Sequence, residues 1–228
     1  MNNKYEIVCY GDSNTHGAVA RWHADEPSRR FDRNTRWTCV LQRELGDNYY
    51  VAEEGLPFRT TIYTETQGKQ YRNGMYMLEG ILETHKPIDL VILMLGTNDM
   101  KLPKKLPKED QGKGVETLAK AILGRSDVGR DGMAPDVLIV SPPALLRADP
   151  MGRTEVFYSF HGEYGIQQSK IIPQVYEKIA RKLGCYYLNS QDYVVADPGD
   201  GVHITAESHI SLGKALAKIV MTISGIGD

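Results

Sequence analysis

The sequence predicts an α/β fold in which helices cover both faces of a five-stranded parallel sheet. Short apolar runs alternate with segments of helical pattern along the 228 residues. Each run is apolar throughout rather than at every second position, which is typical of strands buried on both faces. Right-handed crossover connections place helices on each side of such a sheet. The length suits one domain, residues 1–228, with enough apolar residues for a sizeable core.

The predicted strands are five apolar runs, Glu6–Tyr10, Tyr49–Ala52, Leu90–Leu95, Val137–Ser141 and Cys185–Leu188. Between them, hydrophobic residues recur at helical spacing, as where Val40, Leu41 and Leu45 share one face. The predicted helices are Thr38–Leu45, Met75–Thr84, Val115–Leu123, Ile171–Leu183 and Leu212–Ile223. Two connections are long, His23–Arg36 and Pro142–Gly165. Loops of that length usually bind ligands, contact subunits or cover a site, although the charges of the first one favour a solvated surface.

Composition excludes several classes of function. Twenty-seven basic and twenty-nine acidic residues give a net charge of −2 at pH 7. No general electrostatic field then holds the chain on nucleic acid or on an acidic membrane surface, so the expected partner is a small molecule. Cys9, Cys39 and Cys185 are widely spaced, which predicts reduced thiols and a cytoplasmic location rather than disulfides or a zinc site. We expect neither a secretory signal nor a segment that spans a bilayer.

The segment Gly11-Asp12-Ser13-Asn14 follows the first predicted strand directly. A serine at this point lies at the carboxyl end of a sheet beside backbone N–H groups, which suits a nucleophile. An ordinary strand-to-helix turn, with Ser13 or Asn14 capping the helix, explains this segment alone equally well. Asp12 is expected to fix the turn through hydrogen bonds to nearby N–H groups.

A second motif lies near the C-terminus, where Asp200 and His203 are three residues apart. That spacing lets the carboxylate accept a hydrogen bond from Nδ1 of the imidazole and leaves Nε2 available as a base. Considered alone, the pair is more often the entry turn of a helix with a surface histidine. His209, in the following segment, is expected to be a helix residue rather than a base.

The two motifs together indicate a catalytic site more strongly than either motif does alone. Acyl transfer needs a nucleophile, a base, a group that orients the base, and donors directed at the developing oxyanion. Ser13, His203 and Asp200 supply the first three. The N–H groups of Ser13 and Gly55 and the side-chain amide of Asn98 all follow predicted strands, so they are expected at one edge of the sheet as an oxyanion hole.

The chain resembles the SGNH (GDSL-like) hydrolase family on four blocks in the family's order, Gly11-Asp12-Ser13, Gly55, Gly96-Thr97-Asn98-Asp99 and Asp200-Gly201-Val202-His203. It is most similar to the bacterial arylesterase/acyltransferase branch, through stretches such as Arg36-Trp37-Thr38, Glu53-Glu54-Gly55-Leu56 and Val140-Ser141-Pro142-Pro143. The resemblance implies a flavodoxin-like three-layer α/β/α sandwich. It also implies that Ser13 attacks the ester carbonyl, that His203 is base and then acid, and that Asp200 orients His203.

Several residues are expected around the substrate. The pocket candidates are Asp12, His16, Thr97, Phe157 and Phe160; His16 stands where similar arylesterase/acyltransferases carry tryptophan. The aromatic cluster Phe157–Tyr164 needs a partner for its apolar surface, which predicts a homo-oligomer in which this cluster covers a neighbouring pocket. Asp99 is expected to cap the segment after Asn98, and the lysines from Lys101 to Lys108 to form a solvated loop. No ligand spacing indicates a metal, and no cofactor is expected.

The sequence therefore predicts a serine carboxylic-ester hydrolase that cleaves short-chain, acetyl-type esters through an acyl-enzyme, with acyl transfer as a further activity. Its expected partner is a small ester substrate, with no nucleic acid and no membrane. One alternative is a carbohydrate O-acetyl esterase acting on xylan or oligosaccharides. An alternative of another class is a non-catalytic α/β protein that binds a small ligand in the same crevice, because fold alone does not fix function.

Overall fold

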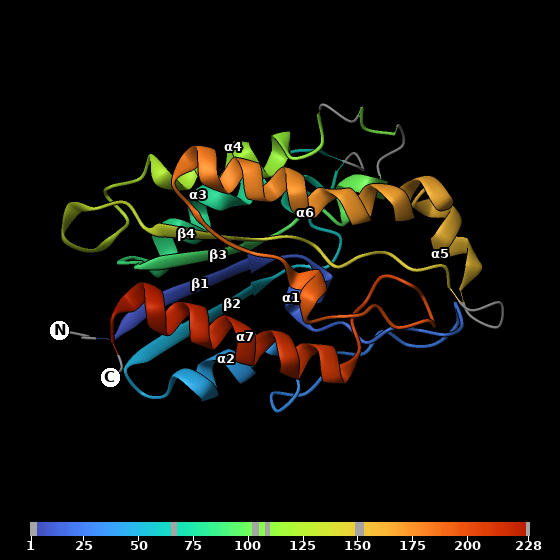
Figure 1. Cartoon of the computed structure of the whole chain (residues 1–228), viewed down its shortest axis with the longest axis horizontal. Coiled ribbons are helices and arrows are strands. Elements are labelled where there is room, and N and C mark those ends of the chain that lie inside the picture. The colour runs from blue at the N-terminus through green and yellow to red at the C-terminus, as the bar shows by residue number, and fades with distance from the viewer. Residues whose placement is uncertain (1–3, 65–67, 102–104, 108–109, 149–152, 227–228) are drawn as a thin grey trace.

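One parallel sheet forms the centre of the computed structural model, which describes residues 4–64, 68–101, 105–107, 110–148 and 153–226 (Figure 1). Its strands lie in the order β2-β1-β3-β4-β5. They are β1 (Tyr5–Gly11), β2 (Tyr49–Gly55), β3 (Leu90–Met94), β4 (Asp136–Val140) and β5 (Tyr186–Leu188). The five-stranded parallel sheet predicted from the apolar runs is thus confirmed.

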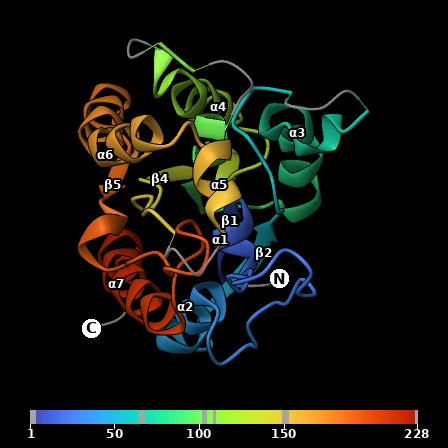
Figure 2. The same cartoon turned by 90° about the vertical axis from the view of Figure 1, so that its right-hand side faces the viewer.

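Helices cover both faces of the sheet and form a three-layer α/β/α sandwich (Figures 1 and 2). One face carries α2 (Trp37–Leu45) and α7 (Ala206–Ser224). The other carries α3 (Gly74–His85), α4 (Lys113–Leu123) and α6 (Glu163–Leu183). Two short helices, α1 (Ser13–His16) and α5 (Thr154–Ser159), lie at the carboxyl ends of the strands.

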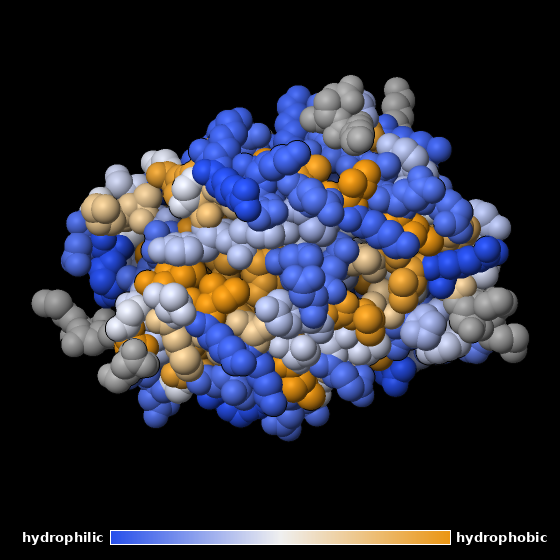
Figure 3. All heavy atoms as spheres, viewed as in Figure 1, coloured by the Kyte–Doolittle hydropathy of each residue, from blue (hydrophilic) through white to orange (hydrophobic). Residues whose placement is uncertain are grey.

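The strands divide the core into two layers because successive side chains point to opposite faces. In β1, Ile7 and Cys9 pack with α2 and α7, whereas Val8 and Tyr10 pack with the other three helices. Figure 3 faces the β5 edge and shows polar residues on the outer sides of α6 and α7, with hydrophobic residues in the band between them. Both helices are therefore amphipathic and bury their apolar sides against the sheet. Among the described helices, none is long and apolar enough to cross a membrane.

Two predicted boundaries are wrong. The connection Pro142–Gly165 contains α5 and the start of α6, so α6 begins at Glu163 rather than Ile171. Similarly, α7 begins at Ala206 rather than Leu212. The connection His23–Arg36, in contrast, is irregular as expected.

The predicted exposure of the aromatic cluster Phe157–Tyr164 is wrong for its central member. Phe160 is only 5% exposed, because it packs within the chain against Leu145, Ile166 and Val202. Phe157 packs against the same group. Tyr158 remains 70% exposed. Most of the cluster therefore needs no second subunit to cover it.

The strand order brings the carboxyl ends of β2, β1 and β3 together. Gly11, the last residue of β1, pairs with Gly55 of β2 on one side and with Met94 of β3 on the other. The chain reverses its direction of progress between β1 and β3, and ligands bind parallel α/β sheets in the crevice at such a reversal. The segments that follow these three strands are therefore the natural place for a site (Figure 2).

Candidate active site

Ser13 is the first residue of α1 and follows β1 after a single intervening residue. Asp12 caps this short helix, because its Oδ1 accepts a hydrogen bond from the N–H of Asn14 at 2.9 Å. The predicted turn-fixing role of Asp12 is thus confirmed. Burial raises the pKa of Asp12 to about 6, although the Asn14 N–H opposes the rise. Gly11 is required here, since a Cβ would lie 1.9 Å from Oγ1 of Thr15.

The predicted Ser13, His203 and Asp200 side chains form a continuous chain of hydrogen bonds. Ser13 Oγ lies 3.0 Å from Nε2 of His203, and Nδ1 of His203 lies 2.6 Å from Oδ2 of Asp200. With Nδ1 protonated and donating to the carboxylate, Nε2 can accept the Ser13 hydroxyl proton. The geometry is that of an activated hydroxyl nucleophile.

Asp200 is ionised and held in place by its own loop. It is 3% exposed, and its Oδ1 accepts hydrogen bonds from the N–H groups of Val202 and His203, each at 3.0 Å. Burial alone would raise the pKa of Asp200, but the hydrogen bond and charge of His203, together with these N–H groups, lower it below its ordinary value. The carboxylate is therefore available to stabilise an imidazolium on His203.

Asn14 fixes the histidine segment to the serine helix, a role that the sequence interpretation missed. Its side-chain Oδ1 accepts from the N–H of Ile204 at 3.0 Å, and its Nδ2 donates to the carbonyl of Val202 at 3.3 Å. These two bonds hold the residues on either side of His203. The signal in the sequence was a polar amide directly after the serine, but its partners are 188 and 190 residues away.

The structure places Asn98 and Gly55 beside the serine helix. Asn98 is 6% exposed and lines the same cavity as Ser13, while its Nδ2 donates one hydrogen bond to the carbonyl of Arg59 at 3.0 Å. An amide carries two N–H bonds, so a second donor remains for a ligand. Gly55 packs so closely on α1 that a Cβ would lie 2.2 Å from the backbone nitrogen of His16. Only glycine fits there.

Arg59, also missed from the sequence, ties these strand ends together. It is 3% exposed, lies 4.2 Å from the centroid of the Tyr10 ring, and donates to the carbonyls of Gly11 (2.9 Å) and Glu54. Its own carbonyl is the acceptor for Asn98. The side chain of Arg59 therefore links the ends of β1 and β2, and its backbone carbonyl binds Asn98 in the segment after β3.

A cavity of about 270 Å³ opens over the serine and is lined by Ser13, Asn98 and His203. Of the predicted pocket residues, His16 and Phe160 line this cavity. The other three are not among its lining residues. Asp12 and Thr97 are buried beneath it, at 1% and 2% exposure, and Phe157 lines a neighbouring cavity instead. Asp12 directly follows β1 and Thr97 lies three residues after the end of β3, and both side chains are buried instead of facing a ligand.

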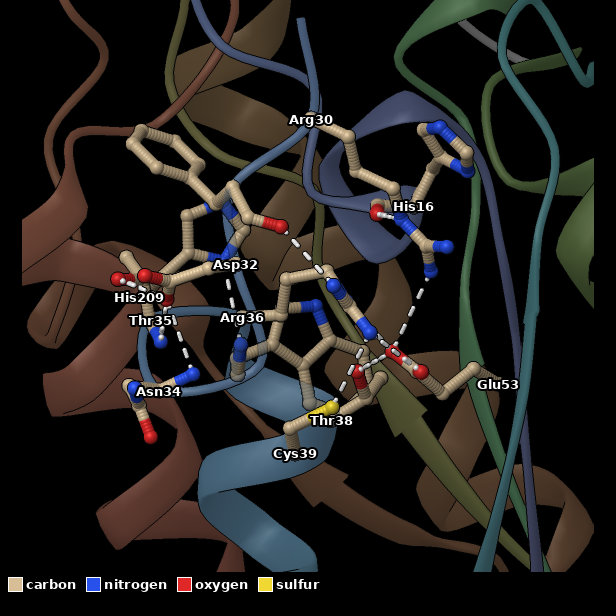
Figure 4. A network of polar contacts seen from close by, with 12 residues as sticks. His16, Arg30, Asp32, Asn34, Thr35, Arg36, Thr38, Cys39, Glu53 and His209 are labelled. Carbon is tan, nitrogen blue, oxygen red and sulfur yellow. Dashed lines mark hydrogen bonds and ion pairs between the residues drawn. The ribbon is translucent and has the colours of Figure 1, made fainter.

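His16 lies at the end of α1, between the cavity and a polar network (Figure 4). Burial and then the charge of Arg30 lower the pKa of His16. Arg30 donates through Nε to the backbone carbonyl of His16 at 2.6 Å and lies 3.4 Å from Glu53. Arg36 binds Glu53 with two bonds, at 2.9 and 2.8 Å, so both guanidinium groups converge on one carboxylate. The network thus fixes the wall of the cavity to β2.

Glu53 gives this network a testable pH dependence. Burial raises its pKa, but hydrogen bonds from Arg36 and Thr38 outweigh burial and lower it to about 2. A carboxyl with a depressed pKa stabilises the fold above its unfolded pKa, and this contribution is lost as pH falls toward 2. Glu53→Gln is expected to lower the free energy of unfolding at pH 7 by on the order of 2 kcal/mol.

Urea unfolding at pH 7 and pH 3 measures this effect. The difference between wild type and Glu53→Gln is expected to shrink at pH 3, because this pH lies below the unfolded-state pKa of Glu53, so unfolding takes up a proton and is favoured in the wild type. Glu44→Gln, at an exposed position of α2, is the matched control. An unchanged difference at both pH values would show that Glu53 acts through packing instead of charge.

Two further residues, His209 and Asp99, form hydrogen bonds away from Ser13. His209 belongs to α7 and is fully buried; its Nδ1 accepts from the N–H of Trp37 at 3.3 Å, and burial lowers its pKa to about 3. It is a neutral helix residue, as predicted. Asp99, predicted to cap the segment after Asn98, accepts hydrogen bonds from the N–H (2.8 Å) and hydroxyl of Thr61. Within the described ranges, no group of three or more His, Cys, Asp or Glu side chains could hold a metal ion.

Comparisons with known proteins place this geometry in context. The model of the GDSL-like lipase/acylhydrolase family matches residues 9–209. That range contains Ser13, Asn98, Asp200 and His203. No curated protein sequence matches the chain significantly.

Many solved structures have a similar fold. A carbohydrate acetylesterase from Sinorhizobium meliloti is 33% identical over 96% of this chain and 100% of its own, with a TM-score of 0.86. An aryl esterase from M. smegmatis is 34% identical over 96% of this chain and 99% of its own, with a TM-score of 0.85. A lipase/acylhydrolase from Enterococcus faecalis, 17% identical with 96% of each chain covered and a TM-score of 0.63, shares the fold.

Proposed function

We propose that this chain, which belongs to the GDSL-like lipase/acylhydrolase family and is a carboxylic-ester hydrolase, cleaves short-chain, acetyl-type esters through an acyl-enzyme on Ser13. One observation carries the proposal. The Ser13 hydroxyl, the His203 imidazole and the Asp200 carboxylate are linked at 3.0 and 2.6 Å beside a cavity that Asn98 also lines. Nucleophile, base, orienting group and oxyanion donor are then in one place.

Acylation begins when His203 Nε2 takes the proton of the Ser13 hydroxyl as Oγ attacks the ester carbonyl carbon. The carbonyl oxygen becomes an oxyanion, for which the donors are the N–H groups of Ser13 and Gly55 and the Asn98 amide. The tetrahedral intermediate collapses as the bond to the alcohol oxygen breaks. His203 returns its proton to that oxygen, and the alcohol leaves. Asp200 stabilises the imidazolium during both transfers.

Deacylation repeats these steps with another nucleophile. His203 takes a proton from water, the hydroxide oxygen attacks the acyl carbon, and the carboxylic acid leaves as Ser13 recovers its proton. An alcohol in place of water gives acyl transfer instead. The balance between the two depends on which acceptor occupies the cavity, where His16 forms part of the wall.

The size of the cavity supports a short acyl group. At about 270 Å³ it is at the low end of small-molecule sites. Acetate esters are therefore expected to have a kcat/KM at least roughly tenfold above that of octanoate esters with the same leaving group. Initial rates with the two 4-nitrophenyl esters measure this ratio. Faster turnover of the octanoate would remove the short-chain assignment, and no turnover of either would favour a non-catalytic binding protein.

The leaving group can be a sugar or an aryl alcohol. The similarity to a carbohydrate acetylesterase favours a carbohydrate O-acetyl esterase, whereas the similarity to an aryl esterase favours aryl acetates. Rates on acetylated xylo-oligosaccharides and on aryl acetates, with and without an added alcohol, separate hydrolysis of each class from acyl transfer. The alternative with the larger kcat/KM is the function.

Assembly and location stay predictions. The aromatic cluster Phe157–Tyr164 predicts a homo-oligomer, and Tyr158, at 70% exposure, is the strongly exposed member of that cluster. Light scattering tests the oligomer directly. The cytoplasmic location rests on the cysteines, all of which are free thiols in the structure.

A further inference from the structure

The wall of the cavity over Ser13 is rich in positively charged side chains. Five basic side chains line it, Arg21, Arg29, Arg30, Lys101 and Arg153. Asp200 is the one carboxylate among the described lining residues, and it is buried and paired with His203. The chain as a whole carries a net charge of −2. The positive charge is therefore a property of the cavity and not of the protein.

Two of these cations, Arg29 and Arg153, each pair with a carboxylate outside the cavity, whereas Arg30 shares Glu53 with Arg36. Arg29 lies 3.9 Å from Glu26, Arg30 lies 3.4 Å from Glu53, and Arg153 lies 2.5 Å from Glu155. An ion pair of this kind leaves little net charge for a ligand. The excess positive charge thus comes from Arg30, which shares its carboxylate, and from Arg21 and Lys101.

Within the part of the chain that the structure describes, neither Arg21 nor Lys101 has a carboxylate within 4.0 Å, although the charge of Arg21 contributes to the lowered pKa of Glu155. The guanidinium of Arg21 donates to the backbone carbonyls of Glu26 (2.9 Å) and Ala24 (3.5 Å), which bind it without neutralising it. Arg21 is half-buried, and so is Lys101. A half-buried cation without a carboxylate partner keeps its charge available for an anionic ligand.

Aromatic rings hold Lys101 in the wall. Its Nζ lies 5.2 Å from the centroid of Phe58 and 5.9 Å from that of Phe160, both of which line the cavity. The guanidinium of Arg72 lies 4.4 Å from the same Phe58 ring. A contact of this kind orients an ammonium group while leaving its charge and its N–H bonds available.

Phe58 occupies this place at a conformational cost. Its φ is 67°, a left-handed value that a bulky side chain rarely adopts. Such strain persists where the surroundings hold it, and it clusters at ligand sites. Here it places a ring that is 41% exposed in the cavity wall between two cations.

We propose that the cavity selects esters whose alcohol portion carries an anionic group, such as a carboxylate or a sulfate, and that Arg21 and Lys101 bind this group. The inference rests on the proposed ester hydrolysis. Ser13 and Asn98 are buried at 7% and 6% exposure, so the scissile carbonyl lies at the floor of the cavity. With a short acyl group, the part of the substrate that can reach the cations of the wall is the alcohol.

A matched pair of substrates tests this selection. 4-Acetoxybenzoate carries a carboxylate, and 4-acetoxybenzamide replaces it with a neutral amide of similar shape. After each kcat/KM is divided by the rate constant for hydroxide hydrolysis, wild type is expected to prefer the anionic ester about tenfold at low salt. The preference is expected to decline with added NaCl, because the Debye length falls from about 10 Å at 0.1 M to about 3 Å at 1 M.

Substitutions of Lys101 and Arg21 test whether these two groups cause the preference for the anionic ester. Lys101→Gln and Arg21→Gln are each expected to lower the ratio of anionic to neutral kcat/KM about threefold or more, whereas Lys214→Gln, exposed on α7, is expected to keep it. Equal corrected rates for the two esters in wild type, at low and high salt, overturn this inference while leaving ester hydrolysis intact. A preference that persists in both variants also overturns it. No turnover of either ester overturns the proposed function as well.

Discussion

Ser13→Ala is expected to lower kcat for acetate esters by about 10⁶-fold, because Ser13 is the hydroxyl that His203 activates for acyl-enzyme formation. The residual rate above buffer would come from the oxyanion donors and from substrate binding. His203→Ala is expected to cost a similar factor, and the double variant little more, since the two residues act as one unit. Initial rates with 4-nitrophenyl acetate and intact-mass labelling by a fluorophosphonate measure both effects.

Ser28→Ala is the matched control, because Ser28 is a second serine of the same cavity. The fluorophosphonate is expected to label Ser28→Ala and not Ser13→Ala. Ser13→Ala removes a single hydrogen bond, to His203, so thermal unfolding is expected to change little. Full turnover or labelling by a folded Ser13→Ala protein would contradict the role given to this residue.

The strands of this fold are predictable because burial on both faces leaves a plain mark in the sequence. Ile7 and Cys9 face one layer and Val8 and Tyr10 the other, so the run between Glu6 and Gly11 contains no polar residue. The order of the strands leaves no such mark. It depends on which face each crossover helix covers, and that choice is made by packing between distant segments.

Helix starts were harder to predict than helix cores. The first two turns of α6 contain Gly165 and a run of polar residues, so they show little hydrophobic period. A glycine is needed at position 165 of this helix because a Cβ there would lie 2.1 Å from the carbonyl oxygen of Phe160. For α7 a local signal did exist, since Thr205 caps the helix by accepting from the N–H of Ser208.

The site likewise contains residues that local sequence patterns predict and residues that they do not. Asp200 and His203 are three residues apart, and Ser13 and Asn98 follow strands, so local spacing and topology were enough to propose their meeting. Asn14 and Arg59 bind groups that only the folded chain brings near. Lys101 looked like part of a solvated loop because its ring partners, Phe58 and Phe160, are more than forty residues away on either side. The residues that position the catalytic groups were thus the hardest to predict from the sequence.

Asp200→Asn is expected to lower kcat by about 10⁴-fold while leaving the fold intact. The asparagine Oδ1 can still accept from the N–H groups of Val202 and His203, which now bind Oδ1 of Asp200 at 3.0 Å. Its Nδ2 would then face Nδ1 of His203, where a donor meets a donor unless the imidazole moves its proton to Nε2. A protonated Nε2 cannot accept the Ser13 hydroxyl proton, so the base is lost although every heavy atom stays in place.

Asp197→Asn is the control for this change, because Asp197 lies in the same loop and its Oδ1 accepts from the N–H of Gly199 at 2.8 Å. An amide oxygen can keep that bond, so kcat is expected to stay near the wild-type value. Thermal unfolding of both variants distinguishes a lost base from a lost fold, and the pre-steady-state rate of Ser13 acylation isolates the step that needs the base. Acylation of Asp200→Asn at the wild-type rate would mean that His203 keeps its tautomer without the carboxylate, and the orienting role would then belong to Asn14 and the loop backbone.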